Sequence, residues 1–298
     1  MVNIPKIFFL AGFALLAVGC SNDGLDSENK SNQLTPVNVR VEGFSIEQAS
    51  LTRVTRATES LANYNDVNAV TLAFYKGDGT EVVKTTQLKA DASTFTTFGE
   101  FACSLPMGSY TMVVLAYLTN ENSVLTLTSP TEASYSLRAR ETFAYTQAVN
   151  ITNNNAVDIS ATLNRIVSRL TVNSTDGKTA DVSNVRMTFA AGGKDFNPST
   201  GFALTNTGFA NTVGNGASVG STSSSSTYLF LSDVTQNINV TIETLDALGN
   251  TLFSETVNDV PFKRNRVTKL TGAMYTNSSI GGTFNIETAW LDDENINF

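Results

Sequence analysis

Few side chains in this sequence could perform acid–base, nucleophilic or metal chemistry. The 298 residues include no histidine and two cysteines, Cys20 and Cys103. Without histidine the chain lacks the commonest general base and metal ligand, and every Ser–His or Cys–His pair. The run Asp292-Asp293-Glu294 is more typical of a solvated chain end than of a cation site. We therefore expect no catalytic residue, no metal and no cofactor, and we do not expect an enzyme.

Cys20 has the clearest chemical role. It follows Lys6 and an apolar run over residues 7–18, which has the length of a signal sequence and is too short to span a bilayer. Small residues lead into the cysteine, so the segment resembles the lipobox of bacterial lipoproteins. An ordinary secretory signal is the alternative. The resemblance implies that residues 1–19 are removed and that acyl chains on Cys20 hold the protein at a membrane. The polar residues 20–36 would then form a flexible tether.

The second cysteine and the charge balance narrow the class of partner. Cys103 has apolar neighbours and is expected to be a buried, unreactive side chain. With Cys20 carrying lipid, no disulfide can form within the chain, and a hydrophobic core must hold the fold. The chain carries 27 acidic and 19 basic residues, a net charge of −8, with no basic cluster among aromatics. Nucleic acid is therefore not an expected partner.

Strand signals dominate the chain beyond the tether. Apolar residues alternate with polar ones, beginning with Val37, Val39 and Val41, and Asp-Gly and Gly-Asn steps mark hairpin turns. Many short strands separated by frequent turns are typical of β-sandwiches, and the chain length favours two. We predict an all-β protein with one sandwich over residues 37–162 and a second over residues 163–298.

Two segments that contain arginines are candidate exposed sites. Arg53 and Arg56 lie in the polar stretch 50–58, between the first strand and the next. An exposed linker of this kind is a natural site for a trypsin-like protease, although a plain loop with two solvated arginines explains the pattern as well. The basic segment 263–266 is expected to be a solvated turn.

Short motifs follow the lipobox in a recognisable order. They are Thr55-Arg56-Ala57, Gly77-Asp78-Gly79, Leu105-Pro106-Met107-Gly108-Ser109-Tyr110, Leu163-Asn164-Arg165-Ile166-Val167 and the segment from Val260 to Gly272. In this order and spacing they resemble the Bacteroidales fimbrillins, the lipoprotein-derived subunits of type V pili, over nearly the whole chain. The resemblance implies two transthyretin-like β-sandwich domains in tandem and a structural role in a surface fimbria (pilus) that mediates cell adhesion.

The resemblance also implies a route of assembly. The lipidated precursor reaches the cell outer membrane, and an arginine-specific protease cuts after Arg56, or after Arg53 as the second choice. The cut would release the first strand, residues 37–44, which includes Val37, Val39 and Val41. An emptied strand position exposes unpaired N–H and C=O groups and a hydrophobic groove, which a strand of another subunit can fill. Repeated head-to-tail exchange does not close and yields a filament.

The expected donor strand is the C-terminal segment, residues 283–298, with Phe284, Ile286 and Trp290 as apolar anchors. The expected partners are other fimbrial subunits, the outer membrane through the lipid on Cys20, and receptors on host or bacterial surfaces. Two alternatives stay open. The protein could be an uncleaved fimbrial anchor or accessory lipoprotein. It could instead be a surface glycan-binding lipoprotein that uses Trp290 with one of three tyrosines: Tyr110, Tyr117 or Tyr135.

Overall fold

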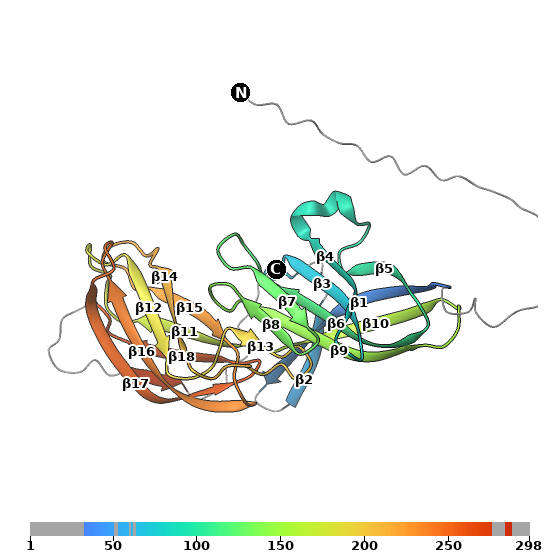
Figure 1. Cartoon of the computed structure of the whole chain (residues 1–298). Coiled ribbons are helices and arrows are strands. Elements are labelled where there is room, and N and C mark those ends of the chain that lie inside the picture. The colour runs from blue at the N-terminus through green and yellow to red at the C-terminus, as the bar shows by residue number, and fades with distance from the viewer. Residues whose placement is uncertain (1–32, 51–52, 60, 62–63, 276–283, 288–298) are drawn as a thin grey trace, which may run out of the picture.

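A computed structural model describes residues 33–50, 53–59, 61, 64–275 and 284–287, and of residues 45–59 and 287 it describes the backbone alone (Figure 1). The predicted leader, Cys20 and Trp290 lie outside the described residues. The first strand begins at Thr35, two residues before the predicted start of the first sandwich at residue 37. The structure is nearly all β, which confirms the predicted fold class.

The N-terminal half is a β-sandwich whose strands form one continuous, folded sheet. The sheet order is β2-β1-β10-β9-β6-β3-β4, and β5 also pairs with β1. Strands β10 and β9 share two residue pairs, Asn164 with Ala144 and Arg165 with Phe143, so the sheet folds into two layers there. The bounds of the strands are β1 (Thr35–Ser50), β2 (Arg53–Glu59), β3 (Ala69–Lys76), β4 (Glu81–Leu88), β5 (Glu100–Leu105), β6 (Gly108–Tyr117), β9 (Thr142–Ile151) and β10 (Val157–Arg165).

The C-terminal half repeats this arrangement with two separate sheets, ordered β15-β11-β18-β19 and β14-β12-β16-β17. In each half the first strand pairs in parallel with a late strand: β1 with β10, and β11 with β18. The other strands correspond in the same order, with β19 as an addition on the edge of β18. The bounds are β11 (Ser168–Ser174), β12 (Asn184–Phe189), β14 (Phe209–Gly214), β15 (Ser224–Leu229), β16 (Thr235–Leu245), β17 (Thr251–Lys263), β18 (Val267–Gly272) and β19 (Asn285–Glu287).

The alternation of apolar residues explains which face of each strand is buried. In β3, Val70, Leu72 and Phe74 face the core of the first sandwich, as a strand with period two requires. The residues between them, which include Ala73 and Tyr75, are also buried, because a second layer covers the outer face of this sheet. A short 3₁₀ helix, η1 (Lys89–Thr94), follows β4.

The covering layer is a small sheet that joins the two halves. It contains β7 (Leu125–Ser129), β8 (Glu132–Tyr135) and β13 (Asp195–Phe196), in the order β13-β8-β7, and it lies between the two lobes (Figure 1). Strand β13 comes from the C-terminal half. Phe196 and Phe230 of that half stack on each other, and Phe230 stacks on Tyr135. The halves therefore share a hydrophobic cluster.

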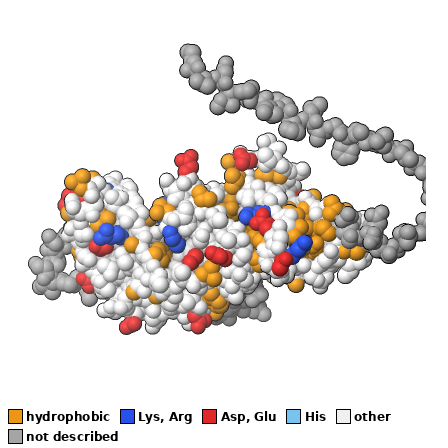
Figure 2. Space-filling model, viewed as in Figure 1, with side chains coloured by type: hydrophobic (Ala, Val, Ile, Leu, Met, Phe, Trp, Pro, Cys, Tyr) orange, Lys and Arg blue, Asp and Glu red, His pale blue; other side chains and the backbone are white. Residues whose placement is uncertain are grey.

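β10 continues through Arg165, past the predicted boundary between residues 162 and 163. We propose that the boundary falls at residues 166–167, between β10 and β11. No helix among the described residues has the length and apolar character needed to cross a membrane. On the face drawn in Figure 2, basic and acidic side chains are scattered among neutral ones.

Tyr75 generates a prediction about alkaline stability. Its side chain is fully buried in the shared cluster and its hydroxyl has no hydrogen-bond partner. Burial, and then the charge of Glu81, raise the pKa of Tyr75 to about 12 from 10.0. The unfolded chain loses this proton first, so the contribution of neutral Tyr75 is complete below pH 10 and is lost as the pH rises toward 12.

We therefore expect Tyr75→Phe to lessen the loss of stability in this alkaline range. At neutral pH it should be neutral or stabilising by about 1 kcal/mol, because it removes an unsatisfied buried hydroxyl. Urea unfolding of both proteins across the pH range measures this. Burial also raises the pKa values of Tyr135 and Tyr228, so part of the alkaline loss should remain. An identical alkaline loss in both proteins would contradict the assignment.

Candidate functional site

Strand β1 is hydrogen-bonded on both sides. It pairs in parallel with β10 along residues 37–45 and antiparallel with β5 along residues 35–40. Val37 and Val39 are at most 1% exposed, and Val41 is 7% exposed. Removing such a strand would leave two rows of unpaired backbone groups and a hole in the core. We call the position that β1 occupies between β10 and β5 the β1 slot.

A β-bulge redirects the second part of β1. The register with β10 shifts between Val41 and Gly43, and the next side chain, Phe44, is fully buried. Its ring centroid lies 4.0 Å from that of Phe143 and 5.1 Å from that of Tyr64. Aromatic contacts of this kind contribute about 0.5–1.5 kcal/mol each beyond the burial of area. The β1 slot thus ends in an aromatic cluster.

Arg53 and Arg56 lie in β2, which forms an antiparallel hairpin with the second part of β1. Arg53 is opposite Ser50, and Arg56 is opposite Glu47. The sequence predicted an open polar linker, and this was wrong: the valine and threonines of the stretch favour an extended, paired strand. Within the described sheet β2 is the end strand, so the arginines lie on its edge.

The C-terminal strand pairs with its own chain. β19 lies antiparallel to β18, with Ile286 opposite Leu270. Phe284 and Ile286 are half-buried and pack against the core of the second sandwich. A Cβ atom at Gly272 would lie 2.8 Å from the Phe284 ring, so the glycine permits this close approach. Two of the three predicted anchors are therefore together on the second sandwich.

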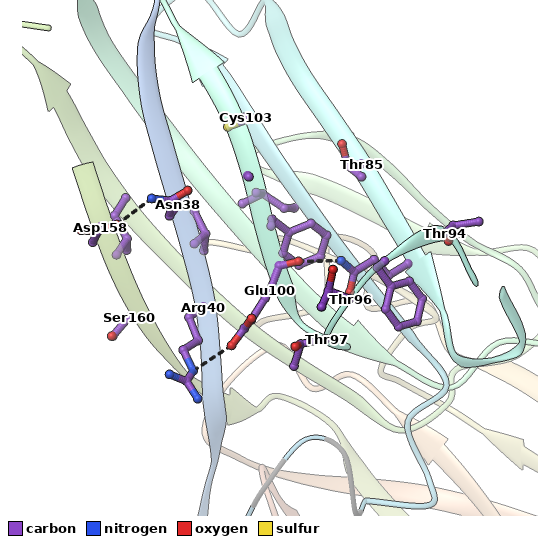
Figure 3. A pocket seen from close by; sticks show the side chains of 17 residues that line it. Asn38, Arg40, Thr85, Thr94, Thr96, Thr97, Glu100, Cys103, Asp158 and Ser160 are labelled. Atoms are coloured by element: carbon purple, nitrogen blue, oxygen red, sulfur yellow. Dashed lines mark hydrogen bonds and ion pairs between the residues drawn. The ribbon is translucent and has the colours of Figure 1, made fainter. Parts of the chain in front are cut away.

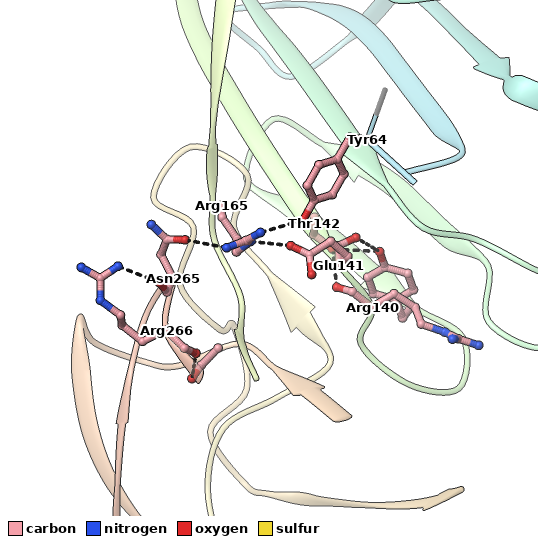
Figure 4. A network of polar contacts seen from close by, with 9 residues as sticks. Tyr64, Arg140, Glu141, Thr142, Arg165, Asn265 and Arg266 are labelled. Atoms are coloured by element: carbon pink, nitrogen blue, oxygen red, sulfur yellow. Dashed lines mark hydrogen bonds and ion pairs between the residues drawn. The ribbon is translucent and has the colours of Figure 1, made fainter. Parts of the chain in front are cut away.

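A buried polar network centred on Arg165 joins the two sandwiches (Figure 4). Arg165 Nε lies 2.5 Å from Glu141 Oε1, and the two side chains are 9% and 4% exposed. Arg165 also donates hydrogen bonds to Tyr64 Oη at 2.7 Å and to Asn265 Oδ1 at 3.2 Å. Its guanidinium lies 5.2 Å from the centroid of the Phe143 ring. Tyr64 and Phe143 also contact Phe44, so the network reaches the β1 slot.

The sequence did not indicate this network. Arg165 and Asn265 each lie in a recognised motif, but nothing in the sequence paired them with each other or with Glu141. Residues 264–265 form a turn, as predicted, and Arg264 in it donates a hydrogen bond to the carbonyl of Thr200 at 2.8 Å and lies over the Phe202 ring at 4.7 Å. Asn265 has a positive φ of 59°, a backbone conformation that asparagine tolerates.

The tyrosines proposed for a glycan platform are unsuitable. Tyr110 and Tyr117 are 4% exposed and Tyr135 is 1% exposed, so none offers a ring face to a ligand. Cys103 is half-buried against the first core, and burial raises the pKa of its thiol, which disfavours the reactive thiolate.

These features define a tandem β-sandwich protein whose first strand is inserted between two others and whose last described strand lies on a sheet edge. Residues 31–297 match the profile described as "Family of unknown function (DUF6562)", and the chain belongs to this family. Among curated proteins, none matches the sequence.

Solved structures are similar to this chain at low sequence identity. A proposed adhesin from Bacteroides ovatus superposes with a TM-score of 0.52 and 10% identity, over 88% of this chain and 97% of that one. Another proposed adhesin from the same species gives 0.50 and 11%, over 80% and 88%. The fimbrial anchor protein Mfa2 from Porphyromonas gingivalis gives 0.48 and 11%, over 85% and 95%.

The Arg165 network predicts a large effect of one substitution. Arg165→Ala should lower the free energy of unfolding by about 3–5 kcal/mol, because it removes the cation that is paired with the buried Glu141 carboxylate. Arg186→Ala is the matched control, since the Arg186–Glu243 pair is more exposed, at 33% and 14%. Its cost should stay below about 1 kcal/mol.

Urea unfolding measures both effects, and limited proteolysis between β10 and β11 should accelerate only in Arg165→Ala. Equal costs for the two substitutions would show that the network does not hold the junction.

Proposed function

We propose that the protein is a structural subunit of a surface fimbria that mediates cell adhesion, and that it assembles by strand exchange. The observation that carries this proposal is the β1 slot. A strand near the chain start has partners on both sides and buries Val37, Val39 and Phe44 almost completely. It precedes the rest of the sandwich in sequence, so one cut downstream separates it from the folded body.

The burial of β1 favours its displacement by another strand over its dissociation into water. Burial of a valine or phenylalanine side chain stabilises by about 1.5–3 kcal/mol, and β1 buries four such residues, Val37, Val39, Val41 and Phe44. A cut after Arg56 or Arg53 would therefore leave β1 bound until another strand replaces it. In this order of events the β1 slot is never empty and exposed to water.

The C-terminal segment is a suitable replacement. Phe284-Asn285-Ile286 repeats the apolar–Asn–apolar order of Val37-Asn38-Val39. Val37–Val39 lie in β1, Asn285 and Ile286 lie in β19 with Phe284 directly before it, and the apolar side chains of both triplets pack against a core. β19 forms three residue pairs with β18, far fewer than β1 forms with its neighbours, so its release costs less. Trp290 would add a further anchor.

The comparisons support the class of function. The proposed adhesins of Bacteroides ovatus share the fold over most of both chains. A surface role agrees with the lipobox-like segment, through which acyl chains on Cys20 would hold the precursor at the cell outer membrane. Other fimbrial subunits and surface receptors would be its partners. No step of this function requires catalysis.

A second candidate is an uncleaved fimbrial anchor or accessory lipoprotein. The position of Arg53 and Arg56 in a paired strand favours it, because proteases cut extended, unpaired chain most readily. In that case β1 and the lipid on Cys20 would both remain, and only the C-terminal strand would take part in exchange.

The N-terminus of the protein on the cell separates these two functions. Mass spectrometry of sheared surface filaments should find a mature start at Ala57 or Val54. Arg56→Gln should shift the start to Val54, and the double variant with Arg53→Gln should abolish filaments while the protein still reaches the surface. A lipidated Cys20 at the start of the chain in every fraction would refute cleavage and support the anchor.

A further inference from the structure

The first sandwich has a groove of about 660 Å³ between its edge strands β4 and β5 (Figure 3). This volume lies within the range of about 300–1,000 Å³ that is typical of small-molecule sites. Its apolar floor includes Val39, Leu72 and Phe101, which belong to the core. Figure 3 shows threonines of β4 and of the segment after η1 on one side, and polar side chains of β1 and β10 on the other.

In the second sandwich the corresponding space between the two edge strands is closed. Its strands β14 and β15 occupy the places of β4 and β5. Asn211 of β14 donates a hydrogen bond to Thr227 Oγ1 of β15 at 2.5 Å, and both side chains are 3% exposed. The groove is therefore not a necessary consequence of the fold. It arises from the residues of the first sandwich.

The lining suits a neutral ligand with many hydroxyl groups. The uncharged hydroxyl and amide groups, which both donate and accept hydrogen bonds, are those of Thr85, Thr94, Thr96, Thr97, Ser160, Asn38 and Gln87. The one basic side chain, Arg40, pairs with Glu100 at 3.3 Å, and Asp158 accepts a hydrogen bond from Asn38 at 2.8 Å. With two carboxylates and one guanidinium, the lining disfavours an anion.

An aromatic ring stands beside these groups. Phe95 is half-exposed in the segment after η1 and lines the groove. Its ring centroid lies 5.7 Å from that of Phe98. An exposed ring beside hydroxyls and amides matches a sugar, which offers an apolar face of C–H groups and a rim of hydroxyls.

The groove is less suited to an added β-strand. Strand addition needs the free backbone groups of an edge. The Gln87 side chain accepts a hydrogen bond from Gly99 N and donates one to Glu100 O, both at 2.7 Å, and so occupies the backbone groups where the β5 edge begins. Such protection is how sheet edges avoid pairing with other chains.

We propose that this groove binds a short neutral oligosaccharide, with Phe95 contacting a sugar face and Thr85 and the neighbouring threonines bonding its hydroxyls. Asn38, Val39 and Arg40 of the lining belong to β1, so the site described is that of the chain with β1 in place, whereas Phe95 and the threonines would remain after strand exchange. The site differs from the tyrosine platform that the sequence suggested, and it gives an adhesion protein a defined receptor chemistry.

The test applies the full chain to an array of neutral, sialylated and sulfated oligosaccharides. The affinity for the strongest neutral oligosaccharide is then measured by calorimetry. We expect selective binding of neutral oligosaccharides. Phe95→Ala and Thr85→Val should each weaken it by about tenfold, the effect of losing one good contact. Thr85→Val preserves the shape of the side chain on an exposed strand position, so it should fold normally.

Phe253→Ala is the matched control, since it removes a half-exposed aromatic ring of the second sandwich away from the groove. The Phe253→Ala variant should bind the oligosaccharide with the affinity of the unaltered protein. Unchanged thermal unfolding midpoints of all three variants would show that they fold normally. The proposal is overturned by the absence of neutral binding, by a preference for anionic oligosaccharides, or by affinity that both groove variants retain.

Discussion

The pairing of β1 with β10 on one side and β5 on the other is the constraint on which the rest of the structure depends. A strand in this position supplies hydrogen bonds to two neighbours and apolar side chains to the core. The slot cannot stand empty, because its unpaired backbone and apolar walls would face water. Phe44 of β1 contacts Tyr64 and Phe143, and both of these contact Arg165 at the junction between the sandwiches. The position of β1 is therefore connected to that junction.

The internal repeat shows why only one of the two sandwiches is suited to strand replacement. β11 occupies in the second sandwich the place that β1 has in the first, in parallel with a late strand. β11 follows β10 directly in the chain, so a cut next to it would divide the folded body. β1 precedes the rest of the first sandwich in the chain, so a cut downstream of it leaves that body whole. Under the proposed assembly, the same architecture would provide a permanent strand in one half and an exchangeable one in the other.

The sequence predicted the fold class because alternation and turn residues are local signals. Val37, Val39 and Val41 were correctly placed on one buried face. Pairing between distant segments has no local signal, so the slot between β10 and β5 and the Arg165–Glu141–Asn265 network appeared only in three dimensions. The paired state of Arg53 and Arg56 was missed for a related reason: polarity suggested a loop, whereas β-branched side chains and a neighbouring strand favoured β2. The tyrosines failed as a binding platform because burial, which sequence alone does not give, decides whether a ring is available.

The central claim is that the β1 slot accepts a strand from another chain. Its most direct test starts from protein nicked after Arg56, with the N-terminal fragment still bound, mixed with a synthetic peptide of residues 283–298. Native mass spectrometry follows the composition with time. Our account predicts that one peptide replaces one N-terminal fragment, and that a peptide with Phe284→Asp and Ile286→Asp does not. Retention of the fragment with no peptide bound, or equal binding of the two peptides, would contradict it.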